Sequence, residues 1–171
     1  MDMEPSPVDA EAYRAFMSSF PTGVSVVTTV DEDGRPRGMT CSSLSSVSLR
    51  PPVLSVCLSV TSKTLGALCA HGYFGVNLLG VGASPVARLF ADSSLSHFER
   101  VPWQPVGNAG LPRLGEDIVA FAACRVADAK VVGDHVVVFG EVFGTDCAVG
   151  APLLYGRRQF VGWPEPAADP V

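Results

Sequence analysis

The sequence lacks any uninterrupted apolar stretch long enough to cross a bilayer, although its mean hydropathy is +0.30. A transmembrane helix needs about 20 consecutive apolar residues, and every apolar run here is broken sooner by Gly, Ser, Thr, Pro or a charge. The first five residues are acidic where a secretory signal would be basic, and no apolar signal core follows. We therefore expect a soluble protein that binds no membrane and stays in the cytoplasm.

Clustered basic residues are also scarce. The formal net charge is -5 at pH 7, and the only adjacent basic pair is Arg157-Arg158. Proteins that bind nucleic acids concentrate positive charge on one surface, where it neutralises phosphates. That class of function is therefore excluded.

Cysteine motifs and the signature loops of common enzymes are missing as well. The chain has no G-x-G-x-x-G after a strand, no Walker loop, no G-x-S-x-G and no H-E-x-x-H. Catalysis by a side-chain nucleophile is therefore not expected. No C-x-x-C or Cys/His pair occurs, so we expect no metal site and interpret the cysteines as small buried hydrophobic residues in a reducing compartment. They are Cys41, Cys57, Cys69, Cys124 and Cys147.

The chain has the length of a single domain and contains few charged residues. Its 171 residues suit a single domain. Hydrophobic residues make up 47% and charged residues 17%, a balance that favours burial of some surface in an obligate dimer. We assign residues 1–8 to a disordered lead, 9–163 to the domain and 164–171 to a flexible tail.

Helical spacing and capping residues indicate three short helices. The first follows Asp9, a capping residue, and carries Tyr13, Phe16, Met17 and Phe20 at helical spacing. The second follows Thr61-Ser62-Lys63-Thr64 directly after a strand. Ser84-Pro85 opens the third, with Ser84 as the cap and Pro85 at the first helical position.

Strand-like alternation covers most of the remaining chain. We expect Arg50-Pro51-Pro52 to break strand pairing and the segment 95–116, rich in Pro and Gly, to form a long irregular loop. Short strands with few helices between them predict a mainly β fold, a closed and mostly antiparallel barrel. The predicted strands are 24–30, a return strand from about residue 35, 53–60, 73–79, 118–132 and 135–149, with hairpin turns at Asp33-Gly34 and Gly133-Asp134.

Two clusters of hydroxyl side chains are the strongest candidates for a binding site. The run GMTCSSLSSVS (38–48) would bring backbone amides and hydroxyls close to a flat polar ligand. An exposed Ser-rich edge strand or loop has the same composition. Ser62-Lys63-Thr64, at the start of a helix, would surround an anion such as phosphate with two hydroxyls, free amides and a cation. The alternative is a plain helix cap with a solvated lysine.

The chain has three histidines. His71 ends the second predicted helix and is interpreted as a cap. His97 lies in the irregular segment beside Phe98, facing either solvent or ligand. His135 begins a strand after a hairpin turn, so its imidazole would point from a barrel rim into a cleft, and a plain surface histidine is the alternative.

Taken together, these segments resemble the flavin reductase family, the reductase components of two-component flavin-dependent monooxygenases. The matching segments are SFPTGVSVVTT (19–29), DGRPRGMTCSSLSSVSLRPPVLSVCLS (33–59), SKT (62–64), FGVNLL (74–79), LFA (89–91), GDHVVVFGEV (133–142) and PLLYGRRQF (152–160). The resemblance implies an FMN-binding split barrel, Greek-key-like and antiparallel, usually a homodimer. It also implies an NAD(P)H:flavin oxidoreductase that reduces FMN or FAD and supplies free reduced flavin to a partner monooxygenase or halogenase.

The resemblance further implies roles for individual residues. His135 matches a catalytic histidine at the nicotinamide face, and His97-Phe98 matches an Arg-Phe pair near the flavin. Two departures are Ser42, where many relatives have Asn, and Leu44, where they have Phe. The implied flavin-binding residues are Thr29, Met39, Thr40, Cys41, Ser42, Ser45 and Ser46 around the ring and ribityl chain, Ser62, Lys63 and Thr64 at the phosphate, and His97, Phe98 and Tyr155.

Two other functions fit the same resemblance. One is a flavin-binding protein without reductase activity, and the other is a split-barrel oxidase or oxygenase that acts directly on an organic substrate. The flavin is expected to be a substrate rather than a prosthetic group. With only two lysines and ten arginines, no obvious basic pocket can be assigned to a 2′-phosphate, which favours NADH as the hydride donor.

Overall fold

The computed structural model describes residues 6–93, 97–115 and 118–164. Most of the predicted lead and tail, 1–5 and 165–171, lies outside the described residues. The helices are α1 (Ala10–Ser18), α2 (Lys63–His71) and α3 (Ser84–Ala91). The strands are β1 (Thr22–Gly23), β2 (Ser25–Val30), β3 (Pro36–Cys41), β4 (Ser45–Leu49), β5 (Pro52–Ser59), β6 (Tyr73–Leu79), β7 (Trp103–Val106), β8 (Leu111–Leu114), β9 (Ile118–Val132), β10 (His135–Cys147), β11 (Leu153–Gly156) and β12 (Gln159–Gly162).

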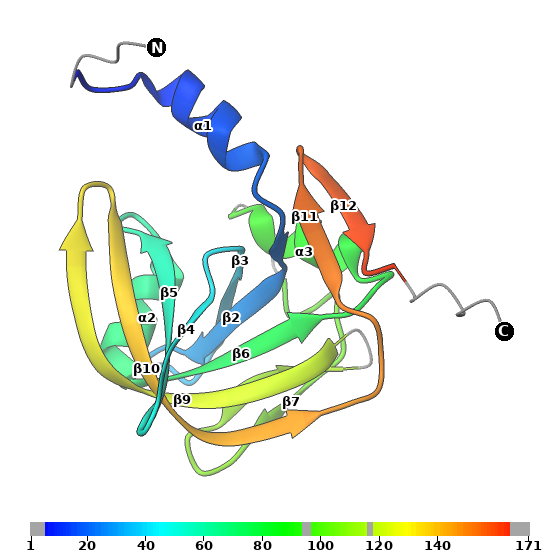
Figure 1. The fold of residues 1–171 in the computed structure, drawn as a ribbon. Helices are drawn as coiled ribbons and strands as arrows, with labels where there is room; N and C mark the ends of the chain where they lie inside the picture. Colours follow the sequence, from blue (N-terminus) through cyan, green and yellow to red (C-terminus); the bar gives the residue numbers. More distant parts are fainter. Residues whose placement is uncertain (1–5, 94–96, 116–117, 165–171) are drawn as a thin grey trace, which may run out of the picture.

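A curved antiparallel sheet of seven strands, in the order β3-β2-β6-β9-β10-β5-β4, forms the body of the molecule (Figure 1). Its two long central strands bend at register shifts, one between Phe139 and Gly140 and one between Val142 and Gly144. Such bulges increase local twist and let a strand change direction. On their outer edges β9 pairs with β6 and β10 pairs with β5, both antiparallel. The prediction of a mainly β, antiparallel fold is confirmed.

Local sequence signals account for the two hairpin turns and for two of the helices. Gly34 and Gly133 take positive φ angles of 74° and 60°, which glycine adopts without steric cost. The Asp9 carboxylate accepts a hydrogen bond from the Ala12 amide at 2.8 Å and caps α1. Ser62 caps α2, which begins where the sequence predicted a helix.

Three local predictions are wrong. Ser84 lies inside α3, and the N-cap position is Ala83, which has no side chain able to make a cap hydrogen bond. Pro51 and Pro52 do not prevent pairing, because β4 and β5 pair antiparallel on either side of them and Leu49 lies opposite Pro52. Within 95–116, the described residues include the hairpin of β7 and β8 rather than one irregular loop.

A buried asparagine attaches this hairpin to the sheet. Asn77 is fully buried, donates from Nδ2 to the Thr28 hydroxyl at 3.1 Å, and accepts from the Leu114 amide at 2.9 Å. The Thr28 hydroxyl in turn donates to the Pro112 carbonyl at 2.6 Å. Buried polar groups are stable only when they are hydrogen-bonded, so this network fixes β7 and β8 against β2 and β6.

The small sheet β1-β11-β12 and helix α3 lie on the opposite side of the molecule from α2 (Figure 1). The core divides accordingly into two clusters. One includes Val86, Phe90 and Leu153, and the other includes Val27, Leu65 and Leu68. Within the described ranges, no helix has the length and hydropathy needed to traverse a bilayer.

Candidate functional site

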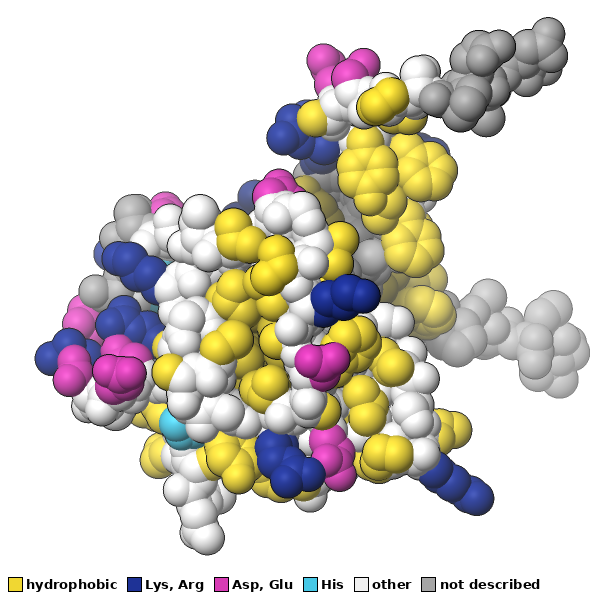
Figure 2. All heavy atoms as spheres, turned by 90° about the vertical axis from the view of Figure 1, so that its left-hand side faces the viewer, with side chains coloured by type: hydrophobic (Ala, Val, Ile, Leu, Met, Phe, Trp, Pro, Cys, Tyr) yellow, Lys and Arg dark blue, Asp and Glu magenta, His cyan; other side chains and the backbone are white. Residues whose placement is uncertain are grey.

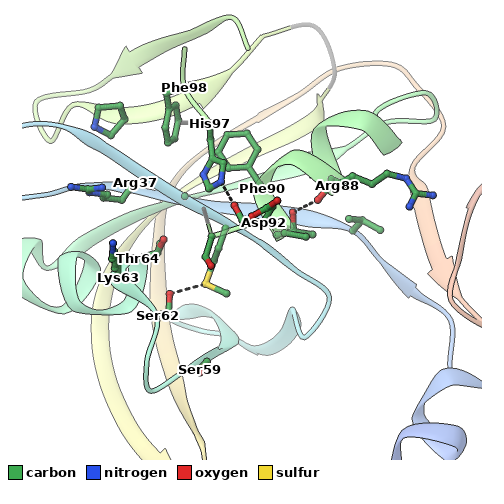
Figure 3. Close-up of a pocket in the computed structure, with 18 of the residues that line it drawn as sticks. Arg37, Ser59, Ser62, Lys63, Thr64, Arg88, Phe90, Asp92, His97 and Phe98 are labelled. Carbon is green, nitrogen blue, oxygen red and sulfur yellow. Dashed lines mark hydrogen bonds between the residues drawn. The ribbon is translucent and has the colours of Figure 1, made fainter. Parts of the chain in front are cut away.

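A cavity of about 1640 Å³ lies between β3, the N-terminus of α2, helix α3 and the β11–β12 hairpin (Figure 3). Ligand pockets usually enclose about 300–1,000 Å³, so this cavity has room for more than one nucleotide. Nine of the residues predicted to bind flavin line it. They are Met39, Thr40, Ser42, Ser62, Lys63, Thr64, His97, Phe98 and Tyr155.

Strand β3 is tied to a helix on each side of the cavity. The Ser62 hydroxyl, at the start of α2, donates to the Met39 sulfur at 3.1 Å. One residue further along β3, the Thr40 hydroxyl donates to the Ala87 carbonyl of α3 at 2.6 Å. These two side-chain bonds join β3 to both walls.

The N-terminus of α2 has the chemistry of a phosphate site. Its backbone amides point out of the helix, and the Ser62 oxygen accepts from the Leu65 amide at 3.4 Å. Thr64 is only 5% exposed and lines the cavity, yet its hydroxyl has no hydrogen-bond partner among the described residues. Lys63 lines the same end of the cavity (Figure 3). An anion placed here would satisfy the Thr64 hydroxyl and meet a cation.

Aromatic rings form another wall of the cavity. Phe90 and Phe98 meet edge to face with centroids 5.1 Å apart, and Phe98 and Trp103 do so at 5.5 Å. His97 packs on Phe90 with centroids 4.9 Å apart, and its Nε2 is hydrogen-bonded to the Asp92 carbonyl. A Cβ atom at Gly38 would lie 2.9 Å from Phe90, so glycine is needed there for the ring to approach β3.

The lining residues carry more positive than negative charge, although the whole chain has a net charge of -5. Fixed charges in a cleft raise the local concentration of ligands of opposite sign, so the cavity suits anionic ligands. The cations are Arg35, Arg37, Lys63, Arg88 and Arg158, and the carboxylates are Asp92 and Glu99.

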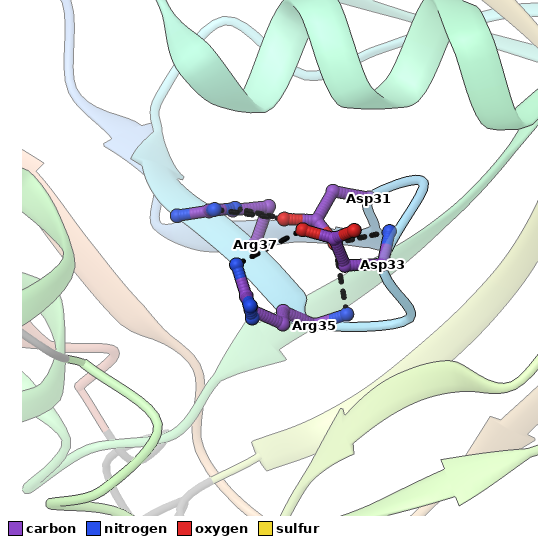
Figure 4. A network of polar contacts seen from close by, with 4 residues as sticks. All are labelled: Asp31, Asp33, Arg35 and Arg37. Atoms are coloured by element: carbon purple, nitrogen blue, oxygen red, sulfur yellow. Dashed lines mark hydrogen bonds and ion pairs between the residues drawn. The ribbon is translucent and has the colours of Figure 1, made fainter.

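Two of these cations are held by carboxylates of the β2–β3 hairpin (Figure 4). Asp31 Oδ2 lies 2.9 Å from Arg37 Nε and 2.7 Å from Arg37 Nη2, and Arg35 Nη1 lies 2.9 Å from Asp33 Oδ2. Hydrogen bonding by the Arg35 amide, supported by the Arg37 guanidinium, lowers the pKa of the Asp31 carboxyl. The hairpin therefore holds Arg37 in place as a fixed charge at the cavity edge.

Four predicted flavin-binding residues do not line the cavity. Thr29 is fully buried and donates its hydroxyl to the Tyr73 carbonyl at 2.8 Å, which joins two strands. Cys41 is also buried, and burial raises the pKa of its thiol. Ser45 and Ser46 lie exposed on β4, on the far side of β5 from β10.

His135, the predicted catalytic residue, lies next to the cavity rather than in its wall. It begins β10 directly opposite Ser59 of β5, and Ser59 lines the cavity. Its side chain is 48% exposed, and Nδ1 lies 2.8 Å from the Asp134 carboxylate. The hydrogen bond from His135 lowers the pKa of Asp134. The imidazole is thus accessible and oriented by a neighbouring carboxylate.

Several lining residues were missed from the sequence. Arg37 and Arg88 carry no motif, and each belongs to an element predicted only as a strand or helix. In the sequence, Arg158 stands out only as half of a basic pair. The structure brings these segments together from distant parts of the chain. Among the described residues, no group of three or more His, Cys, Asp or Glu could hold a metal ion.

The model of the flavin reductase like domain family matches residues 17–164. The chain belongs to this family. Flavin reductase (NADPH) of Lentzea aerocolonigenes is 48% identical over 156 residues, 91% of each chain. Flavin reductase (NADH) of Kitasatospora aureofaciens is 42% identical over 166 residues, which are 96% of this chain and 87% of that protein.

Solved structures agree with this family assignment. The crystal structure of BorF, the flavin reductase component of a bacterial two-component tryptophan halogenase, superposes with a TM-score of 0.85 at 32% identity, covering 92% of this chain and 100% of that one. The predicted split-barrel fold of the flavin reductase family is thereby confirmed.

For this flavin reductase domain, Thr64→Val should weaken FMN binding without loss of stability, because the Thr64 hydroxyl makes no intramolecular hydrogen bond. Loss of one hydrogen bond to a charged group predicts about tenfold weaker binding. Quenching of FMN fluorescence measures the affinity, and thermal unfolding measures stability.

Ser62→Ala is the matched comparison. It removes the α2 cap together with a hydroxyl predicted to bind the phosphate, so it should weaken FMN binding and also lower the free energy of unfolding by about 1 kcal/mol. Unchanged FMN affinity in Thr64→Val would exclude Thr64 from the phosphate site.

Proposed function

We propose that the cavity binds FMN or FAD beside NAD(P)H, and that the chain is an NAD(P)H-dependent flavin reductase whose reduced flavin leaves for a partner monooxygenase or halogenase. The observation that carries this proposal is one cavity of about 1640 Å³ with a phosphate site at one end and aromatic walls. Such a cavity can hold two nucleotides with their rings in contact.

The flavin fits the residues that line the cavity near β3 and α2. Its phosphate is bound by Thr64, Lys63 and the free amides at the start of α2. Its ring lies along β3, where Thr40 and Ser42 offer polar groups. Phe98 packs against the aromatic wall and excludes water from one side of the ring.

The chemistry needs little from the protein once both nucleotides are bound. Hydride passes directly from the nicotinamide to the flavin, a reaction that the two molecules supply themselves. The side chains therefore act by holding two rings in register and keeping water away. This explains why the cavity is lined by hydroxyls, aromatic rings and cations instead of a nucleophile and base.

His135 positions the nicotinamide in this proposal. It lies opposite Ser59 at the cavity edge, and Asp134 orients its imidazole through Nδ1. The opposite ring nitrogen, Nε2, is then available for a polar group of the nicotinamide. His135 would act on the second nucleotide while Lys63 and Thr64 act on the first.

The relatives support the role of a reductase component. BorF is the flavin reductase component of a two-component halogenase. The partner of this chain would be a flavin-dependent oxygenase or halogenase that captures the reduced flavin in solution. The wide cavity is compatible with release of the flavin after each turnover.

The chain is proposed to act as a homodimer, because α1 and the residues just after it carry exposed aromatic side chains that pack on no other part of the described chain. Tyr13, Phe16 and Phe20 are 58%, 72% and 63% exposed. A nine-residue helix is unstable without packing. Figure 2 shows a band of hydrophobic side chains on the body of the molecule and further hydrophobic side chains on the segment that projects above it. A second copy would cover both surfaces.

A cytoplasmic location is proposed as well. All five cysteines are free, and Cys69 and Cys147 are exposed, so the prediction that all five are buried is wrong. Exposed thiols persist in a reducing compartment and are oxidised outside it.

Steady-state oxidation of NADH and NADPH with added FMN or FAD tests the main proposal. We expect rapid loss of absorbance at 340 nm that depends on added flavin and shows saturation with it. A protein that binds flavin but oxidises neither nucleotide would be a flavin-binding protein. One that keeps a yellow flavin through purification and oxidises both nucleotides poorly would instead be an oxidase or oxygenase.

His135→Ala should lower kcat/KM for NAD(P)H about tenfold, the effect of losing one positioning hydrogen bond. FMN affinity should change much less, because the phosphate site is built from other residues. His71→Ala is the control, since His71 ends α2 and contacts the Tyr73 carbonyl instead of the cavity. Equal kcat/KM in wild type and His135→Ala would remove His135 from the site.

Light scattering coupled to size-exclusion chromatography should give twice the mass of one chain. Phe16→Asp places a charge in the apolar stripe of α1 and should raise the dimer dissociation constant at least about tenfold. Glu11→Gln, in the first turn of the same helix, should leave the mass unchanged. A monomeric wild type would refute the homodimer.

A further inference from the structure

The turn between β11 and β12 has an unusual composition. Gly156 pairs with Gln159, so the loop consists of Arg157 and Arg158 alone. Both have positive φ angles, 49° and 61°. Two-residue hairpin loops of this conformation strongly prefer Gly, Asn or Asp, because side chains with a Cβ are strained there. Arginine at both positions is contrary to this preference. The conformation of the turn therefore does not explain the two arginines, and a reason is to be sought in the surroundings of their side chains.

Only one of the two arginines lines the cavity. Arg158 is part of its wall and Arg157 is not. Arg157 instead donates its backbone amide to the Ser18 carbonyl at 2.6 Å, which joins the turn to the end of α1. Within the described ranges, the Arg158 guanidinium has no ion pair or hydrogen bond. It is therefore a free cation facing a ligand cavity.

A second cation and two rings lie at the same end of the cavity. The Arg88 guanidinium, from α3, lies 5.0 Å from the centre of the Phe160 ring. Phe160 in turn packs on Tyr155 with centroids 5.0 Å apart. All of these residues line the cavity together with Arg158. Guanidinium groups beside aromatic rings suit a phosphate attached to a nucleoside.

We propose that Arg158 and Arg88 bind the 2′-phosphate of NADPH, and that the chain prefers NADPH to NADH. This rests on the proposed function. The flavin phosphate occupies the α2 end, at Lys63, so the phosphates of the second nucleotide are repelled from there and extend toward α3 and the β11–β12 turn. NADH lacks the 2′-phosphate, so only NADPH can use both arginines. The NADH preference expected from the sequence is thereby reversed.

The turn offers a matched pair of variants. Arg158→Gly and Arg157→Gly both replace a strained arginine by glycine and remove one positive charge, and both should raise the melting temperature. Only Arg158→Gly removes a cation from the cavity. The ratio of kcat/KM for NADPH to that for NADH should fall about tenfold in Arg158→Gly and stay at the wild-type value in Arg157→Gly.

Direct binding gives a second measurement that needs no turnover. Adenosine 2′,5′-bisphosphate and adenosine 5′-monophosphate differ only in the 2′-phosphate, and calorimetry compares their affinities for each protein. Wild type and Arg157→Gly should bind the bisphosphate more tightly, and Arg158→Gly should lose most of this difference.

Each outcome decides the proposal. A wild-type preference for NADH overturns the proposal that Arg158 and Arg88 bind the 2′-phosphate. So does a NADPH-to-NADH ratio of kcat/KM that falls equally in both variants, or that falls by less than about threefold in Arg158→Gly. Flavin-dependent oxidation of both nucleotides with no role for Arg158 leaves the proposed function intact. If neither nucleotide is oxidised, the proposed function fails, and the binding comparison still decides whether Arg158 recognises a 2′-phosphate.

Discussion

The attachment of β3 to helices on both of its sides is the constraint on which the site depends. The Ser62 hydroxyl ties the start of α2 to Met39, and Thr40 ties β3 to the Ala87 carbonyl of α3. Because these bonds arise from consecutive residues of one strand, they fix the separation of the phosphate site and the aromatic wall. Strand β3 thus runs between the two helices that border the cavity and is bonded to both.

The distribution of charge around the cavity favours anionic ligands. The chain is acidic overall, yet most charged residues around the cavity are cations. Among the residues that the structure describes, Arg37 is fixed by Asp31, whereas Lys63 and Arg158 face the cavity without an ion-pair partner. In a chain of net negative charge, this cluster of cations directs anionic nucleotides to the cavity.

Local signals in the sequence were sufficient for most elements, and contacts between distant segments account for the misses. Asp33-Gly34 and Gly133-Asp134 specify their turns without help from the rest of the chain. The β7–β8 hairpin escaped notice because Asn77, far away in sequence, supplies its buried hydrogen bonds. The family resemblance implied that Thr29 contacts the flavin, but β2 is covered on both faces, so the Thr29 hydroxyl is buried away from the cavity. The cations of the cavity come from four separate segments of the chain, so no sequence motif could predict that they lie together.

The turn at Arg157 and Arg158 shows how folding and binding can impose opposite demands on one residue. Both side chains occupy backbone conformations that glycine would adopt without strain. Selection for thermostability alone would therefore favour glycine at position 158 and remove a positive charge from the cavity wall. A more thermostable variant of this protein should be sought at other positions, because at this turn a substitution that raises stability also weakens substrate recognition.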